Sequence, residues 1–122
     1  MKIMLPLILL GCLMQTACGP LETKARDTIG AMKGLLDSEQ ALHQSECSIN
    51  SKTILCDAIQ RGAAAQNALV TVTEDFCGFN HAAPPAADAV CVPNKALAPS
   101  LQTAIGNVNL LIAEIKAASG GR

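Results

Sequence analysis

Apolar residues recur at steps of three and four along three stretches of the chain, which is the spacing of a helix that buries one face. The stretches run over about residues 21–46, over about 53–77, and from near Pro99 to the tail Ser119-Gly120-Gly121. Proline is favoured in a first helical turn, and glycine commonly follows a last one. Three amphipathic helices in a chain of 122 residues predict an all-α fold, a small three-helix up-down-up bundle.

Each stretch carries one apolar stripe, which is predicted to face the core. The charged side chains of the first stretch are expected to be solvated, namely Lys24, Asp27, Lys33, Asp37 and Glu39. The predicted core positions are Leu21, Ala25, Ile29, Met32, Leu35, Leu36 and Leu42 in the first stretch, Leu55, Ala58, Ile59, Gly62, Ala65, Leu69, Val72 and Phe76 in the second, and Leu101, Ala104, Ile105, Val108, Leu111, Ile112 and Ile115 in the third.

Two glycines and one serine allow predictions about local helix packing and helix capping. Gly30 and Gly34 lie one turn apart in the first stretch, and each costs about 1 kcal/mol relative to alanine inside a helix. The pair therefore suggests a close approach of this backbone to a neighbour. Ser51 is a candidate N-cap for the second stretch, because its hydroxyl can accept from a free backbone N–H.

The end of the second stretch admits a different structure. Residues 69–73 are rich in β-branched side chains, which favour strands, and only residues 89–93 offer a partner for such a strand. Helices with a short two-stranded ribbon are thus the alternative fold. Residues 80–99 hold Pro84-Pro85 and are expected to be extended or irregular.

The start of the chain reads as an export signal. A basic Met1-Lys2 precedes the apolar run 3–14, which is too short for a stable membrane span, and small residues follow it. Residues 1–17 are therefore predicted to be a signal peptide and residues 18–122 a single helical domain.

The end of this signal resembles that of a bacterial lipoprotein, in which a small residue precedes a cysteine that is lipidated, with palmitate among its acyl chains. Thr16-Ala17-Cys18 gives the apolar core its better length, whereas Leu9-Leu10-Gly11-Cys12 matches the usual letters more closely. We favour Cys18 as the lipid attachment site and keep Cys12 as the alternative. The resemblance implies stable attachment to a membrane, and Gly19 fits sorting to the outer membrane, facing the periplasm. The alternative prediction is an ordinary signal peptide, whose cleavage would give a soluble secreted protein.

Four cysteines remain after Cys18, an even set that suits an oxidising compartment. Cys56 and Cys77 are separated by a whole helix of about 31 Å, whereas a disulfide tolerates only about 4.4 to 6.8 Å between Cα atoms. The topology therefore predicts two loop disulfides, Cys47–Cys56 at one end of the bundle and Cys77–Cys91 at the other.

The composition and the polar residues of the chain limit which functions it can have. The formal net charge is −1 and aromatic residues make up 2% of the chain, so it lacks the basic patches and stacking rings of a nucleic-acid binder. His43 with Cys47, and Cys77 with His81, have the spacing of metal-ligand pairs, but bridged cysteines could not bind a metal. Glu74-Asp75 reads as a solvated acidic patch. We expect no metal, no cofactor and no catalytic residue set.

The sequence thus predicts a membrane-anchored lipoprotein whose domain is a non-enzymatic binding or structural module of the bacterial cell envelope, with a protein partner there. Helical sequence begins within a few residues of Cys18, so the domain is expected to sit close to the bilayer. A carrier of a small apolar ligand or lipid in the periplasm is the alternative function, although helices rich in alanine and glycine leave little cavity.

Overall fold

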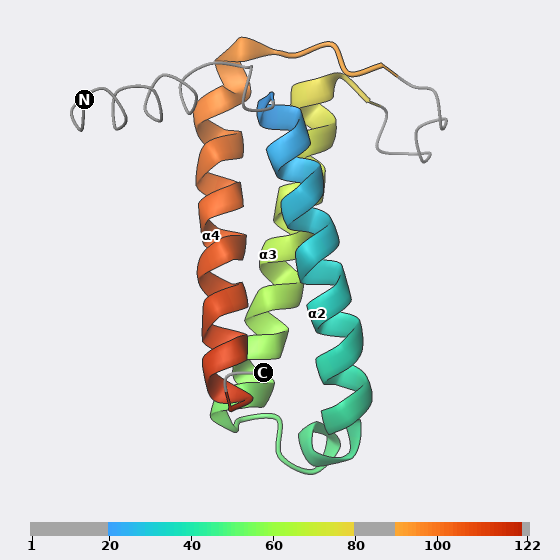
Figure 1. The fold of residues 1–122 in the computed structure, drawn as a ribbon, viewed down its shortest axis with the longest axis vertical. Helices are drawn as coiled ribbons and strands as arrows, with labels where there is room; N and C mark the ends of the chain where they lie inside the picture. Colours follow the sequence, from blue (N-terminus) through green and yellow to red (C-terminus); the bar gives the residue numbers. More distant parts are fainter. Residues whose placement is uncertain (1–19, 80–89, 121–122) are drawn as a thin grey trace, which may run out of the picture.

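The computed structural model describes residues 20–79 and 90–120, which form an up-down-up bundle of three helices (Figure 1). They are α2 (Leu21–Ile49), α3 (Ile54–Cys77) and α4 (Ala98–Ala118), with a short 3-10 helix, η2 (Lys95–Leu97), leading into α4. The predicted all-α bundle is confirmed. The two-stranded ribbon does not form among the described residues, because 69–73 continue α3 as helix.

The ends of α3 are set by two specific residues. Thr53, in extended conformation, is its N-cap, and its hydroxyl oxygen accepts from the Cys56 N–H at 3.1 Å. The prediction of Ser51 as this cap is wrong, because the helix starts two residues later. At the other end Gly78 adopts a left-handed φ of 75°, which glycine reaches without strain, and its N–H donates to the Asp75 carbonyl.

The core lies along the axis between the three helices and follows most of the predicted stripes, and the clearest departures from them are in α2. Leu42 is 61% exposed, whereas Glu39, expected in solvent, is only 4% exposed. Steps of three and four from Met32 and Leu36 lead to 39 and 43, so position 42 points about a quarter of a turn away from the core. The core residues are Ala25, Met32, Leu36, Leu55, Ala58, Ile59, Leu69, Phe76, Cys77, Leu101, Ala104, Val108, Leu111 and Ile115.

The glycines that permit close packing are not the ones expected. A Cβ on Gly62 of α3 would lie 2.9 Å from Cδ1 of Ile115 and 3.3 Å from Cε of Met32, so all three helices meet at this point. Gly30 and Gly34 are exposed, and a Cβ on either would meet nothing within 4 Å. The expectation of a close approach at these two positions is therefore wrong within the described residues.

Both predicted disulfides are present. Cys47–Cys56 joins the end of α2 to the start of α3, with Cα atoms 5.5 Å apart. Cys77–Cys91 joins the end of α3 to the segment that leads into η2, with Cα atoms 4.4 Å apart. Each bridge closes a short loop at one end of the bundle, a constraint worth about 3 kcal/mol in the chain-entropy view.

One described helical segment, Lys95–Ala118, is long and apolar enough to cross a membrane by length and composition alone. In the bundle its stripe of Leu101, Val108 and Ile115 is fully buried, while Asn107 and Asn109 are exposed. The outer side also carries Leu110, which is 63% exposed, but the fully buried apolar stripe is the pattern of a bundle helix.

The glycines give a direct stability test of this packing. Gly34→Ala is expected to raise the free energy of unfolding by about 1 kcal/mol, because an exposed helical alanine costs less backbone entropy. Gly62→Val is expected to lower it by about 1 to 3 kcal/mol, because the added methyl groups overfill the core. Urea unfolding followed by circular dichroism measures both changes. Equal effects at the two positions would contradict the packing described above.

Candidate functional site

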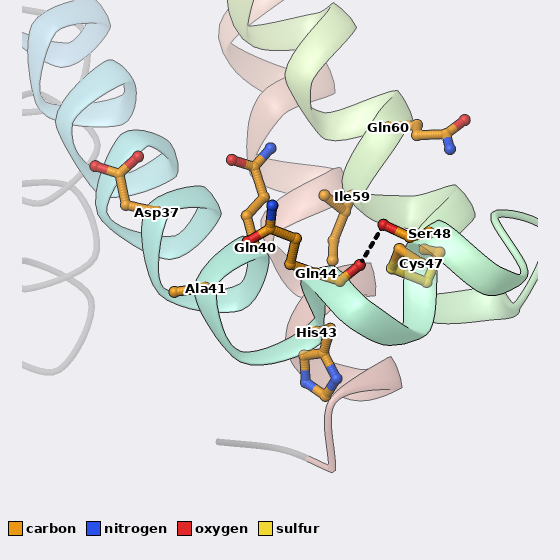
Figure 2. Close-up of a pocket in the computed structure, with 10 residues that line it drawn as sticks. Asp37, Gln40, Ala41, His43, Gln44, Cys47, Ser48, Ile59 and Gln60 are labelled. Atoms are coloured by element: carbon orange, nitrogen blue, oxygen red, sulfur yellow. Dashed lines mark hydrogen bonds between the residues drawn. A yellow bond between two sulfur atoms is a disulfide. The ribbon is translucent and has the colours of Figure 1, made fainter.

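An open depression of about 560 Å³ lies between the C-terminal part of α2 and the first turns of α3 (Figure 2). Asp37, Gln40, Gln44 and Ser48 border it from α2, at steps of three and four that place them along one side of the helix. Gln60 borders it from α3. The Cys47–Cys56 disulfide and the buried Ile59 also line it.

The depression is open, and polar and apolar groups contribute to its lining in nearly equal measure. Its amide side chains can both donate and accept hydrogen bonds. Its one lining carboxylate, Asp37, accepts from the Lys33 ammonium at 2.9 Å, and both side chains are exposed. A site for a small apolar ligand would instead be enclosed and lined mainly by hydrophobic groups.

A buried carboxylate stands beside this depression. The Glu39 side chain is 5% exposed, and its Oε1 lies 3.6 Å from Nε2 of His43, a residue that lines the depression. The other ring nitrogen of His43, Nδ1, lies 3.3 Å from Oε1 of Glu46, whose side chain is half exposed. One imidazole thus stands between a buried and a solvated carboxylate, all on one side of α2.

Two atoms of this cluster are buried without a hydrogen-bond partner, namely Oε1 of Glu39 and Nε2 of His43. They face each other slightly beyond hydrogen-bond distance, so a small closing movement with a proton on Nε2 would pair them. Buried polar groups are nearly always satisfied, which makes an unsatisfied carboxylate at a core position a candidate for function.

The cluster lacks the nucleophile of a hydrolytic triad at the depression. Ser48 is the serine that lines it, and its hydroxyl donates to the Gln44 carbonyl oxygen at 2.9 Å. A triad requires the base to accept the proton of its nucleophile. The depression is therefore an open surface feature with the buried Glu39 carboxylate and the His43 imidazole at its edge.

The sulfur atoms predicted as possible metal ligands are bridged. Cys47 and Cys77 belong to the two disulfides, so neither offers a thiolate to a metal with its neighbouring histidine. His81, Cys12 and the predicted lipid site Cys18 lie outside the described residues.

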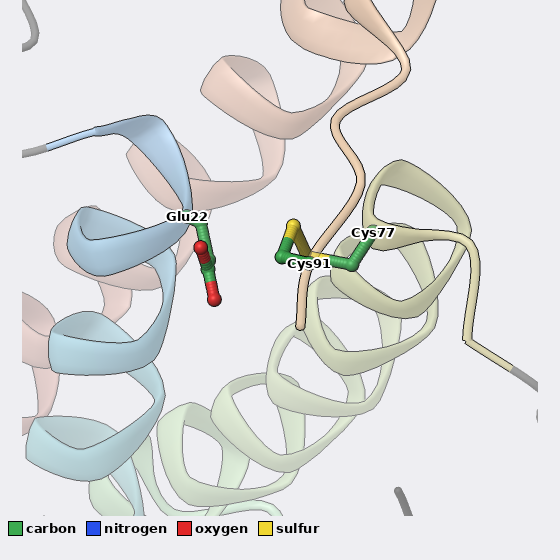
Figure 3. Close-up of side chains that lie close together, drawn as sticks. All are labelled: Glu22, Cys77 and Cys91. Carbon is green, nitrogen blue, oxygen red and sulfur yellow. A yellow bond between two sulfur atoms is a disulfide. The ribbon is translucent and has the colours of Figure 1, made fainter. Parts of the chain in front are cut away.

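At the opposite end of the bundle, a carboxylate oxygen of Glu22 lies within 4.8 Å of the sulfurs of Cys77 and Cys91 (Figure 3). This carboxylate also pairs with the Arg26 guanidinium at 2.8 Å. Because the sulfurs are bridged, the group is a carboxylate packed against a disulfide and has no free thiolate for an ion. It places the first turn of α2 directly beside the Cys77–Cys91 bridge.

One guanidinium ties α3 to α4. Arg61 donates to Asp57 on its own helix at 2.8 Å and to Glu114 on α4 at 2.9 Å. The hydrogen bond with Asp57, and next that with Glu114, raise the pKa of Arg61 above its ordinary value. The group is solvent-exposed, so its contribution is mainly to the register of the two helices.

Sequence reasoning missed the Glu39–His43 pair, although a signal for it exists. Continuing the apolar stripe of α2 from Leu36 by steps of three and four reaches positions 39 and 43, and both are polar. A titratable residue at a core register position is the pattern that indicates such a site.

Replacing Glu39 tests whether the buried carboxylate is retained at a cost in stability. Glu39→Leu is expected to raise the free energy of unfolding by about 1 to 2 kcal/mol, because it removes a buried carboxylate oxygen that has no hydrogen-bond partner. Glu46→Leu, at the half-exposed carboxylate on the other side of His43, is the matched control and should change it by less than about 0.5 kcal/mol. Urea unfolding at neutral pH measures both. Destabilisation by Glu39→Leu would show that the attraction to His43 exceeds the desolvation penalty.

Comparisons with protein-family models, with curated protein sequences and with solved structures find no match to this chain.

Proposed function

We propose that this chain is a small exported bacterial lipoprotein, attached to the membrane through Cys18, whose helical bundle is a non-enzymatic binding module of the cell envelope. The observation that carries the proposal is the pairing of Cys47 with Cys56 and of Cys77 with Cys91. Such bridges persist in oxidising compartments, which lie beyond the cytoplasm. The two bridges use all four cysteines of the bundle. Neither Cys12 nor Cys18 is therefore needed as a disulfide partner for them.

The predicted signal peptide also supports export to the cell envelope. Residues 1–17 have the basic start, apolar run and small residues of a signal peptide, and Ala17-Cys18-Gly19 resembles the cleavage region of lipoproteins. By that resemblance, Gly19 after the lipidated cysteine fits the outer membrane, with the domain in the periplasm.

The depression between α2 and α3 supports a protein partner as the ligand. It is open and lined in part by the amide side chains of Gln40, Gln44 and Gln60, which can hydrogen-bond to a partner's surface. The core at Gly62 is closely packed, which argues against a carrier of an apolar ligand between the helices.

The attachment is tested on the mature N-terminus. Mass spectrometry of the N-terminal peptide from the host is expected to show a peptide that begins with an acylated Cys18. Cys18→Ala should move the protein from the membrane fraction to the soluble fraction, and Cys12→Ala, the matched control, should leave it on the membrane. An unmodified peptide beginning near Gly19 would identify a soluble secreted protein instead.

The binding surface is tested by site-specific crosslinking in cells. A photo-reactive residue in place of Gln44, at the depression, is expected to give one discrete adduct with an envelope protein. The same residue in place of Asn109, on the outer side of α4, should give none, although both positions are exposed. Loss of the Gln44 adduct on adding Gln40→Ala would assign it to the depression. Identical adducts from both positions, or none from Gln44, would refute this surface.

A further inference from the structure

The segment that precedes η2 is fixed against the C-terminal end of α3. The Val92 N–H donates to the Cys77 carbonyl at 3.1 Å and the Asn94 N–H to the Phe76 carbonyl at 2.8 Å. The Cys77–Cys91 disulfide holds the same segment covalently. The two hydrogen bonds use the last carbonyl groups of α3, which have no partner inside the helix. Residues 90–94 therefore form a strap with a defined orientation.

The orientation of the strap turns two valines outward. Successive side chains of an extended chain point to opposite sides. Cys91 points inward to its disulfide, so Val90 and Val92 point away from the bundle, where they are 78% and 71% exposed. A pair of exposed β-branched apolar side chains on a fixed strap is a preformed apolar contact.

The strap lies at the end of the bundle where the described chain begins. Pro20 and the first turn of α2 are at this end (Figure 1), and the Glu22 carboxylate lies within 4.8 Å of the sulfurs of Cys77 and Cys91 (Figure 3). Cys18 precedes Pro20 by two residues, which span at most about 7 Å of extended chain. A lipid on Cys18 would therefore hold this end of the bundle at the bilayer surface.

We propose that the strap is a second membrane contact: Val90 and Val92 insert into the lipid interface beside the acyl chains of Cys18, and the bundle stands on this end. The inference rests on the proposed lipid attachment and adds to it the surface that touches lipid. Two adjacent insertions hold a protein on a bilayer more firmly than one. The last turn of α3 carries Glu74 and Asp75, and η2 carries Lys95, so the contact is apolar and does not depend on an excess of basic residues.

Tryptophan fluorescence can report this contact without background, because the chain contains no Trp and no Tyr. A single introduced Trp is then the sole indole fluorophore. Val92→Trp places it on the strap, and Ile54→Trp places it at an exposed position at the opposite end of the bundle. Leu110→Trp, on the exposed side of α4, reports a bundle that lies on its side. Circular dichroism verifies that each variant keeps its helices.

The experiment uses the mature lipidated protein, purified from its host and reconstituted into vesicles of phosphatidylethanolamine and phosphatidylglycerol. The emission of Val92→Trp is expected to shift to shorter wavelength and to be quenched strongly when brominated acyl chains are included. Emission from Ile54→Trp and Leu110→Trp should be unchanged by either treatment. High salt should leave the Val92→Trp quenching in place.

The outcomes separate this inference from the proposal on which it rests. Protein that is acylated and floats with the vesicles, but whose Val92→Trp is unquenched, overturns the strap contact and leaves the anchor intact. Quenching of Leu110→Trp equal to that of Val92→Trp also overturns it, because the bundle then lies along the surface. Protein that carries no acyl group and stays in solution overturns both the anchor and the contact.

Discussion

The disulfide at each end of the bundle fixes where one helix stops and the chain turns. Cys47–Cys56 closes the turn between α2 and α3, and Cys77–Cys91 binds the approach to α4 onto the end of α3. The apolar core between these bridges has one buried aromatic side chain among the described residues, Phe76, and several alanines that bury little area. The entropy that the bridges remove from the unfolded chain offsets this shortage, as is common in small exported domains.

The small core residues also set the distance between the helices. Gly62 lets Met32 of α2 and Ile115 of α4 reach the α3 backbone, so the three helices are close at the centre of the bundle. Farther down, α2 presents Ala41 and amide side chains toward α3, and the depression opens there. A tightly packed middle and a more open end thus arise from the choice of side chains at successive turns, and the depression lies toward that open end.

The pattern of apolar steps was sufficient for the three helices, for most of their buried positions and, with the length of α3, for the cysteine pairing. It failed where a residue type suggested one environment and the register required another. Leu42 is apolar but lies off the buried stripe, and Glu39 is charged but lies on it. Gly30 and Gly34 share their spacing with packing glycines, yet only tertiary contacts decide which side of a helix meets a neighbour, and these favour Gly62. The depression depends on side chains of two helices and could not be read from either alone.

The length of α2 has a consequence for where a partner can be. This helix has 29 residues, and the depression borders its C-terminal part, from Asp37 to Ser48. If the strap rests on lipid, a rise of 1.5 Å per residue puts the polar surface about 25 to 40 Å above the headgroups. Any protein recognised there must extend at least that far from the same leaflet, or come to it from across the aqueous compartment. A flat peripheral protein on the same membrane would pass beneath it.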